Sequence, residues 1–223
     1  MKSVRLIENF RSFQGEGPDM GTGMLILRFK TCNLKCPWCD TSVKMRISAE
    51  APYLLSDIQK QIDDTNCGLL ITGGEPTVPK HYDEALALLN KLEYPIANVE
   101  SNGYKLAQLI LSTSKTKNVK FMYSPKIFTV EDYNAAVDRT KDLLDFDNVY
   151  IKVVYEDRAL VTEYLETLSH IIGKDRFASR RVWLMPEGTN RSTLIKNSGE
   201  VFDVAEKYKF NFSSRSHIIY GFV

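Results

Sequence analysis

Short apolar runs alternate along the chain with longer stretches in which apolar residues recur at helical spacing. The runs predict buried strands at residues 24–29, 69–72, 96–100, 119–123, 149–155 and 182–185. The stretches between them predict helices near Ser56 and at 82–92, 106–111, 131–144, 160–172 and 201–208. Ser56-Asp57-Ile58-Gln59 has the form of a capping box, which would begin the first of these helices. Alternation of this kind is typical of βα units around a parallel sheet, so we predict an α/β fold.

Polar and glycine-containing segments follow most of the predicted strands. They are Thr31 with the residues after it, Thr72-Gly73-Gly74-Glu75-Pro76, Glu100-Ser101-Asn102-Gly103, Ser124-Pro125-Lys126 and Pro186-Glu187-Gly188. Ligands of parallel α/β sheets bind at the carboxyl ends of the strands. The sequence therefore predicts a ligand site built from these segments along one edge of the sheet.

Three cysteines, Cys32, Cys36 and Cys39, follow the first predicted strand in a C-x3-C-x2-C pattern. Thiolates are the ligands of iron–sulfur clusters, which usually take four of them. Three ligands leave one iron of a [4Fe–4S] cube with an open position, where a metal can do chemistry. The alternative is a structural zinc site with Cys67 or His81 as fourth ligand, although such sites usually contain two cysteine pairs.

Composition narrows the class of protein. The chain has 223 residues, which suits one domain over residues 1–223, and 29 basic and 28 acidic residues give a net charge of +1. No basic excess indicates a nucleic-acid partner, so the composition favours a small-molecule substrate. We find neither the apolar core of a signal peptide nor a run that could span a membrane. We therefore expect a cytoplasmic protein with no membrane partner and with reduced thiols.

The cysteine loop, with Trp38 before its last cysteine, resembles the cluster loop of radical S-adenosylmethionine (SAM) enzymes. The resemblance implies a partial (β/α)6 TIM-like barrel with the cluster loop after its first strand. It also implies that SAM binds the open iron of a [4Fe–4S] cluster and is cleaved to a radical by one electron. An electron donor such as flavodoxin would then be needed.

Four segments resemble the SAM contacts of that family: the cluster loop, the Gly-Gly-Glu turn and the two polar segments that follow the next strands. The implied SAM-binding residues are Trp38, Cys39, Asp40, Gly74, Glu75, Glu100, Ser101, Ser124, Pro125 and Lys126. Glycines would allow the backbone to approach the ligand closely, and a carboxylate could accept hydrogen bonds from the SAM ammonium group. The alternative for the Gly-Gly-Glu, 100–103 and 124–126 segments, each taken alone, is an ordinary turn.

Phe13-Gln14-Gly15-Glu16-Gly17-Pro18, together with Arg28, resembles the substrate segment of the 7-carboxy-7-deazaguanine synthase family. The implied reaction contracts the ring of 6-carboxy-5,6,7,8-tetrahydropterin and releases ammonia. A guanidinium suits the substrate carboxylate, and amides suit a pterin edge. The implied substrate-binding residues are Phe13, Gln14, Gly15, Glu16, Arg28, Thr72 and His217. A plainer interpretation makes the segment a turn and pairs Arg28 with Glu16.

Other positions carry weaker signals. The resemblance implies that Thr41 helps to hold Mg²⁺, a hard ion that prefers oxygen ligands, whereas the alternative is a helix cap. In the tail, Arg215 stands where the family often has glutamine, two residues before His217. We expect His81 and His170 on exposed helix faces and Cys67 in the core.

Two other classes of protein compete with the synthase. An activating enzyme for a glycyl-radical partner, such as anaerobic ribonucleotide reductase, shares the cysteine loop but not Gln-Gly-Glu-Gly joined to Ser-Pro-Lys. An electron carrier or a zinc module would not need Gly-Gly-Glu-Pro at a strand end. The resemblance to the synthases further implies a homodimer.

Overall fold

The computed structural model describes residues 1–156, 159–173 and 179–222. These residues form two compact units, Met1–Gln14 with Gly21–Met122, and Gly15–Met20 with Tyr123–Val223. Among the described residues, every helix is too short or too polar to cross a bilayer.

The first unit is built on strands in the order β2-β3-β5-β6-β7. β2 (Glu8–Phe13) is antiparallel to β3 (Gly23–Phe29), whereas β5 (Gly68–Gly73) and β6 (Ala97–Ser101) continue in parallel before β7 (Val119–Tyr123). β3 and β5 are apolar on both faces, as expected for strands buried on both sides of a parallel sheet. Leu25, Leu27, Leu69 and Ile71 are completely buried.

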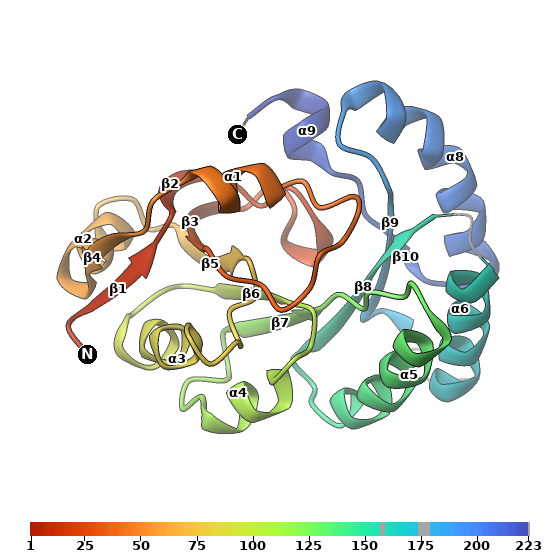
Figure 1. Ribbon diagram of the computed structural model, residues 1–223, viewed down its shortest axis with the longest axis horizontal. Helices are drawn as coiled ribbons and strands as arrows, with labels where there is room; N and C mark the ends of the chain where they lie inside the picture. Colours follow the sequence, from red (N-terminus) through yellow and green to blue (C-terminus); the bar gives the residue numbers. More distant parts are fainter. Residues whose placement is uncertain (157–158, 174–178, 223) are drawn as a thin grey trace. The chain divides into compact units, whose positions relative to one another are not determined.

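Helices of the first unit follow its strands. They are α1 (Ser42–Ile47), α2 (Leu55–Asp63), α3 (Tyr82–Lys91) and α4 (Leu106–Ser112). Figure 1 shows α3 and α4 along one face of β6 and β7. A separate antiparallel pair joins β1 (Ser3–Leu6) to β4 (Ala51–Leu54).

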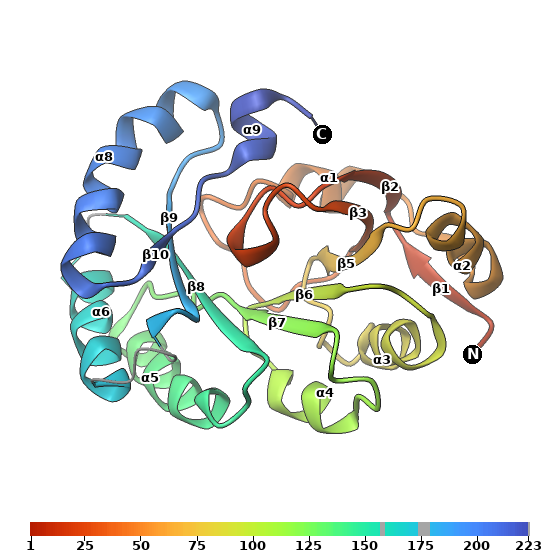
Figure 2. The same ribbon diagram turned by 180° about the vertical axis from the view of Figure 1, so that it is seen from behind.

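The second unit contains parallel strands in the order β8-β9-β10. Their bounds are Val149–Tyr155, Val182–Pro186 and Asn211–Phe212. Three long helices, α5 (Val130–Leu144), α6 (Ala159–Ile172) and α8 (Arg191–Tyr208), lie together along these strands (Figure 2). The short elements are η1 (Gly17–Asp19) and α9 (Ser216–Tyr220).

The six predicted strands are confirmed as β3 and β5 to β9, each followed by a helix. β1, β2, β4 and β10 were not predicted. The predicted capping box at Ser56 is wrong, because α2 begins at Leu55 and its N-cap Leu54 makes no side-chain cap bond. A capping box is present instead at α5, where Thr129 and Asp132 bond each other's backbone N–H groups. α8 begins at Arg191 rather than at 201.

Candidate functional site

The cysteine loop leaves β3 from a base that is held by backbone bonds. Gly74 N–H donates to the carbonyl of Phe29 (2.9 Å), and Glu75 N–H donates to the carbonyl of Thr31 (2.8 Å). These two bonds join the Gly-Gly-Glu turn after β5 to the last residues before Cys32. The start of the cluster loop is therefore positioned by the neighbouring strand.

Gly73 and Gly74 are needed for this approach of two backbones. Gly73 has φ +121°, a conformation that favours glycine, and a Cβ there would lie 2.3 Å from the backbone of Phe29. A Cβ on Gly74 would lie 2.1 Å from the carbonyl oxygen of Thr31. Whatever the turn does for a ligand, its glycines are already required by contact with the cluster loop.

The three cysteines of the loop are half-buried thiols. The Cys32 sulfur accepts from Leu34 N–H (3.4 Å), and the Cys39 sulfur lies 3.5 Å from Thr41 Oγ1. No group of three His, Cys, Asp or Glu side chains within the described part of the chain is gathered around a point that would suit one metal ion. In a [4Fe–4S] cube each thiolate would bind a different iron.

His81 is completely buried, so the prediction of an exposed helix position is wrong. Its ring stacks on Phe29 with centroids 4.7 Å apart, and Nε2 accepts from Thr31 N–H (2.9 Å). Burial, assisted by the charge of Lys80, lowers the pKa of His81 to about 4. The neutral ring therefore carries its proton on Nδ1, which lies 3.6 Å from a Glu84 carboxylate oxygen. His81 supports the base of the cluster loop and has no lone pair to offer a metal.

Glu75 is fully buried and receives four hydrogen bonds from neutral donors. Its Oε1 accepts from Thr77 N–H (3.0 Å), the Thr77 hydroxyl (2.6 Å) and the Ser101 hydroxyl (2.8 Å). Its Oε2 accepts from Asn102 N–H (2.6 Å). The carboxylate thus joins the turn after β5 to the turn after β6, two of the segments predicted to bind SAM.

Asn102 links this network to the cluster loop. Its amide nitrogen donates to Asn33 Oδ1 (2.9 Å) and lies 3.9 Å from the Cys32 sulfur. An N–H group directed at a ligand sulfur is one of the factors that set the potential of an iron–sulfur cluster. Sequence reasoning did not assign this role to Asn102.

Arg28 pairs with Glu8 at 2.6 Å rather than with Glu16, the partner named by the plainer interpretation. Glu8 also receives Lys44 of α1 at 2.8 Å. Burial alone would raise the pKa of the Glu8 carboxyl, but the bonds from Lys44 and Arg28 outweigh it and lower that pKa. The three side chains carry two positive charges and one negative charge. Thr72, another predicted substrate residue, is the Cα partner of Arg28 on β5.

Two further predicted substrate residues lie at the end of β2. Gln14 is 4% exposed, and its amide donates to Asn98 Oδ1 on β6 (3.0 Å). Phe13 directly before it has 52% of its surface exposed. The Gln14 amide is therefore held by a side chain of β6, whereas about half of the Phe13 surface faces solvent.

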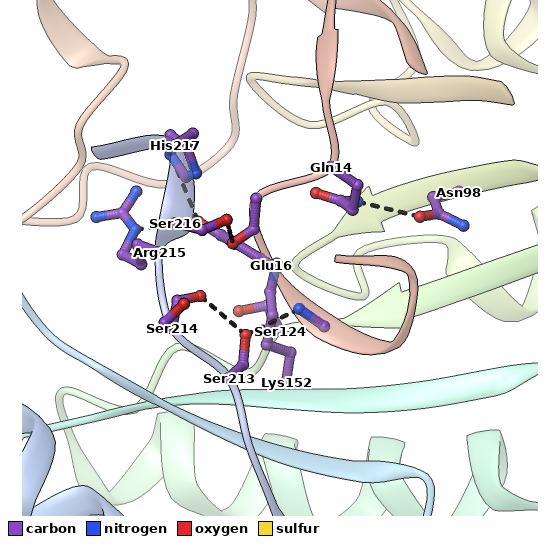
Figure 3. A network of polar contacts seen from close by, with 12 residues as sticks. Gln14, Glu16, Asn98, Ser124, Lys152, Ser213, Ser214, Arg215, Ser216 and His217 are labelled. Carbon is purple, nitrogen blue, oxygen red and sulfur yellow. Dashed lines mark hydrogen bonds and ion pairs between the residues drawn. The ribbon is translucent and has the colours of Figure 1, made fainter. Parts of the chain in front are cut away.

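Glu16 is the centre of an ionic cluster in the second unit (Figure 3). Its Oε2 accepts from Lys152 Nζ on β8 (2.5 Å), and its Oε1 accepts from Arg215 Nε (3.0 Å) and lies 3.9 Å from His217 Nε2. Burial alone would raise the pKa of the Glu16 carboxyl. The charges of Lys152, Arg215 and His217 outweigh burial and hold that pKa far below its usual range.

The remaining predicted positions have local partners or lie exposed. Lys126 turns back so that its ammonium donates to the carbonyl (2.9 Å) and hydroxyl (2.6 Å) of Ser124. Thr41 occupies the N-cap position of α1, but its side chain makes no cap bond, so the helix-cap alternative does not account for it. Asp40 is exposed and Trp38 is half-buried. His170 is exposed and Cys67 is buried, as predicted.

The partners that sequence reasoning missed are Glu8, Lys44, Thr77, Asn98, Asn102 and Lys152. Most of them lie outside the recognisable motifs. Arg215 was noticed only because it differs from the usual glutamine, and its pairing with Glu16 across 199 residues could not be inferred. A buried lysine inside the apolar run 149–155 was a signal that could have pointed to an ion pair.

Comparison with known proteins gives one domain family and a group of related enzymes. A profile described as a 4Fe-4S single cluster domain matches residues 13–163. A 7-carboxy-7-deazaguanine synthase from Hyperthermus butylicus is 27% identical over 97% of this chain and 92% of its own length. A synthase of the same name from Thermoplasma acidophilum is 32% identical over 68% of this chain and 70% of its own length.

A solved structure supports the fold. The crystal structure of QueE from Escherichia coli matches with a TM-score of 0.62 at 19% identity, over 96% of this chain and 95% of that chain. The structural likeness confirms the predicted α/β radical SAM fold, and the sequence relatives define the family. This chain therefore belongs to the 7-carboxy-7-deazaguanine synthase family and contains a 4Fe-4S single cluster domain.

Proposed function

We propose that this chain converts 6-carboxy-5,6,7,8-tetrahydropterin into 7-carboxy-7-deazaguanine with loss of ammonia. The observation that carries the proposal is the thiol loop seated on the Gly-Gly-Glu turn, in a chain related to the synthases over almost its whole length. Family membership favours this enzyme over a glycyl-radical activating enzyme, an electron carrier or a zinc module.

Cys32, Cys36 and Cys39 would hold three irons of a [4Fe–4S] cluster and leave the fourth iron for SAM. When bound, the cluster supplies one electron and SAM supplies the radical chemistry. The chain's own task is to fix the loop, which Gly74, Glu75 and His81 do through Thr31 and Phe29. The Thr41 hydroxyl, next to the Cys39 sulfur, is our proposed Mg²⁺ ligand.

We assign SAM contacts to the segments around Cys39, Gly74, Ser101 and Ser124. Because the Glu75 carboxylate and the Ser101 hydroxyl already bond within the protein, we assign them the task of shaping the SAM site through the two turns they join. The remaining proposed SAM-binding residues are Trp38, Asp40, Glu100, Pro125 and Lys126.

For the substrate we assign Arg28 to the carboxylate. Its Nε is used by Glu8, which leaves the planar Nη fork for a bidentate contact. The excess of one positive charge among Arg28, Lys44 and Glu8 also favours an anion. The other proposed substrate residues are Phe13, Gln14, Gly15, Glu16, Thr72 and His217.

We further propose that residues 1–223 act as one radical SAM domain, since the matched profile includes residues of both units. A low-potential donor such as flavodoxin would supply the electron, and the chain would form a homodimer. The four reduced cysteines suit the cytoplasm, where disulfides are rare.

Anaerobic turnover tests the function. Reconstituted protein is given SAM, dithionite, Mg²⁺ and 6-carboxytetrahydropterin, and 7-carboxy-7-deazaguanine is measured by chromatography and mass. We expect Cys36→Ala to lose both cluster absorbance and SAM cleavage. Cys67→Ala, a buried thiol outside the loop, is the matched control and should keep both.

The possible outcomes test the parts of the proposal separately. If SAM is cleaved but no product forms, the assigned substrate is wrong and the radical chemistry stands. If Cys36→Ala binds a full cluster, the assignment of Cys36 as a cluster ligand is wrong. If turnover is unchanged when Mg²⁺ is omitted, the proposed role of Mg²⁺ is wrong.

A further inference from the structure

We propose that Lys152 and Arg215 are positioning residues for substrate recognition, which fix the place and charge of the Glu16 carboxylate so that it can accept N–H groups of the heterocycle. Nothing in the family resemblance assigns a role to Lys152, and Arg215 is a departure from the usual glutamine. The inference rests on the proposed function, because Glu16 is one of its substrate residues.

The ionic cluster around Glu16 holds its carboxylate, a hydrogen-bond acceptor, in one orientation. The side chains of Lys152, Arg215 and Glu16 are only 4%, 9% and 14% exposed. Each cation binds a different oxygen of the carboxylate, so rotation of the carboxylate would break at least one contact. Arg215 is itself anchored, because its Nη1 donates to the carbonyl of Gly188 (2.7 Å).

The backbone on both sides of Glu16 is held by the same C-terminal segment. Gly17 N–H donates to the Ser213 hydroxyl (2.8 Å), and Ser216 N–H donates to the Gly15 carbonyl (3.0 Å). A Cβ at Gly15 would lie 2.0 Å from the His217 ring, so a larger residue here would displace that ring. Figure 3 shows the Ser213–His217 segment alongside Glu16, with Lys152 reaching it from β8. Both the main chain and the side chain of Glu16 are therefore fixed.

An anionic carboxylate suits the chemistry of the ligand. The pyrimidine edge of a pterin presents a ring N–H beside an exocyclic amino group, and an ionised carboxylate can accept both. A protonated carboxyl would instead present an O–H, which would lose one of these bonds. In a site this dry a carboxylate without cations would tend to take up a proton, and the two cations prevent this.

A double-mutant cycle tests the inference. Lys152→Met, Arg215→Gln and Glu16→Gln are compared singly and in pairs, with Lys141→Met as the matched control for loss of an exposed lysine in the same unit. Cluster content and substrate-independent SAM cleavage are measured first, because a folded, loaded variant must retain both. Turnover with 6-carboxytetrahydropterin then gives KM and kcat.

We expect Lys152→Met and Arg215→Gln each to raise KM by about 10- to 100-fold, since each removes a bond to a charged group. Either change combined with Glu16→Gln should be no worse than Glu16→Gln alone. Arg215→Lys, which keeps the charge, should recover most of the affinity. Lys141→Met should leave KM unchanged.

Effects that multiply in the double variants, or an unchanged KM in the single ones, would overturn the inference while leaving the proposed function intact. If Lys152→Met or Arg215→Gln fails to fold, the cycle is completed with the variant of the other cation, together with Arg215→Lys. Absence of product from the wild-type enzyme would overturn the proposed function, and this inference would fall with it.

Discussion

Two buried carboxylates, Glu75 in the first unit and Glu16 in the second, are stabilised in different ways. Both directly follow a glycine, and both lie in motifs that resemble ligand-binding segments. Glu75 is surrounded by neutral donors, whereas Glu16 is bound by two cations. Neutral donors on successive turns fix the geometry of the backbone, while cations also fix the charge of the acid. The difference supports our proposals that Glu75 belongs to the frame of the cluster loop and that Glu16 takes part in substrate recognition.

The largest expected effect comes from Glu75→Ala. Removing the carboxylate leaves the donors of Thr77, Ser101 and Asn102 without their acceptor, and buried unsatisfied groups cost about 1–3 kcal/mol each. Because hydroxyls can reorient, we expect a loss of about 3–5 kcal/mol in the free energy of unfolding of the cluster-free protein. Urea denaturation followed by circular dichroism measures it.

Glu75→Gln is the matched control for that experiment, since it keeps one oxygen and removes the charge. It should cost about 1–3 kcal/mol, because the new NH₂ faces a backbone donor. A loss below 1 kcal/mol in Glu75→Ala would show that the network does not hold the two turns together.

Lys152→Met is expected to have an intermediate effect that depends on pH. It should destabilise the protein by about 1.5–3 kcal/mol near pH 7, the usual worth of a bond to a charged group. Since the folded pKa of Glu16 is lowered, its stabilising effect is present above the ordinary glutamate pKa and is lost as pH falls. Without Lys152 the folded pKa of Glu16 should rise, because one of the charges that outweigh burial is lost. Variant and wild type share the same unfolded state, so the difference between them should shrink as pH falls through the raised pKa of the variant. A difference that stays constant down to the lowest pH at which both proteins remain folded would contradict the ion-pair assignment.

Ser101→Ala should have the smallest effect. It removes one neutral donor to Glu75 and one acceptor for Gly103 N–H, so we expect a loss of about 0.5–1.5 kcal/mol. The loss is measured in denaturation curves recorded beside those of the Glu75 variants. A loss as large as that of Glu75→Ala would show that the hydroxyl, rather than the carboxylate, holds the two turns together.

Sequence patterns predicted the strands and most helices because buried parallel strands form apolar runs. β1, β4 and β10 were not predicted, because strands of two to four residues are too short to show a recognisable alternation or run of apolar residues. The start of α8 was missed because residues 191–200 are largely polar and include Gly199. The predicted capping box at Ser56 failed because the serine lies inside the helix, where its hydroxyl donates to Asp57 and does not cap the helix.

The motifs located the candidate site, but not the contacts that support it. Lys152 and Arg215 lie 136 and 199 residues from Glu16 in the sequence. The residues adjacent to them in the sequence do not indicate that Glu16 is their partner. The sequence predicted an exposed position for His81 at the start of a helix. Its ring is buried instead, because it stacks on Phe29 and accepts a hydrogen bond from Thr31 N–H. Such pairings arise only when distant strands and turns meet.

Thr31 is held at both its amide and its carbonyl by other parts of the polypeptide. The point at which the cluster loop leaves β3 is therefore set without any contribution from a thiol. Fixing this point restricts the conformations open to the arc from Cys32 to Cys39, which lowers the entropic cost of gathering its three thiols around a cube.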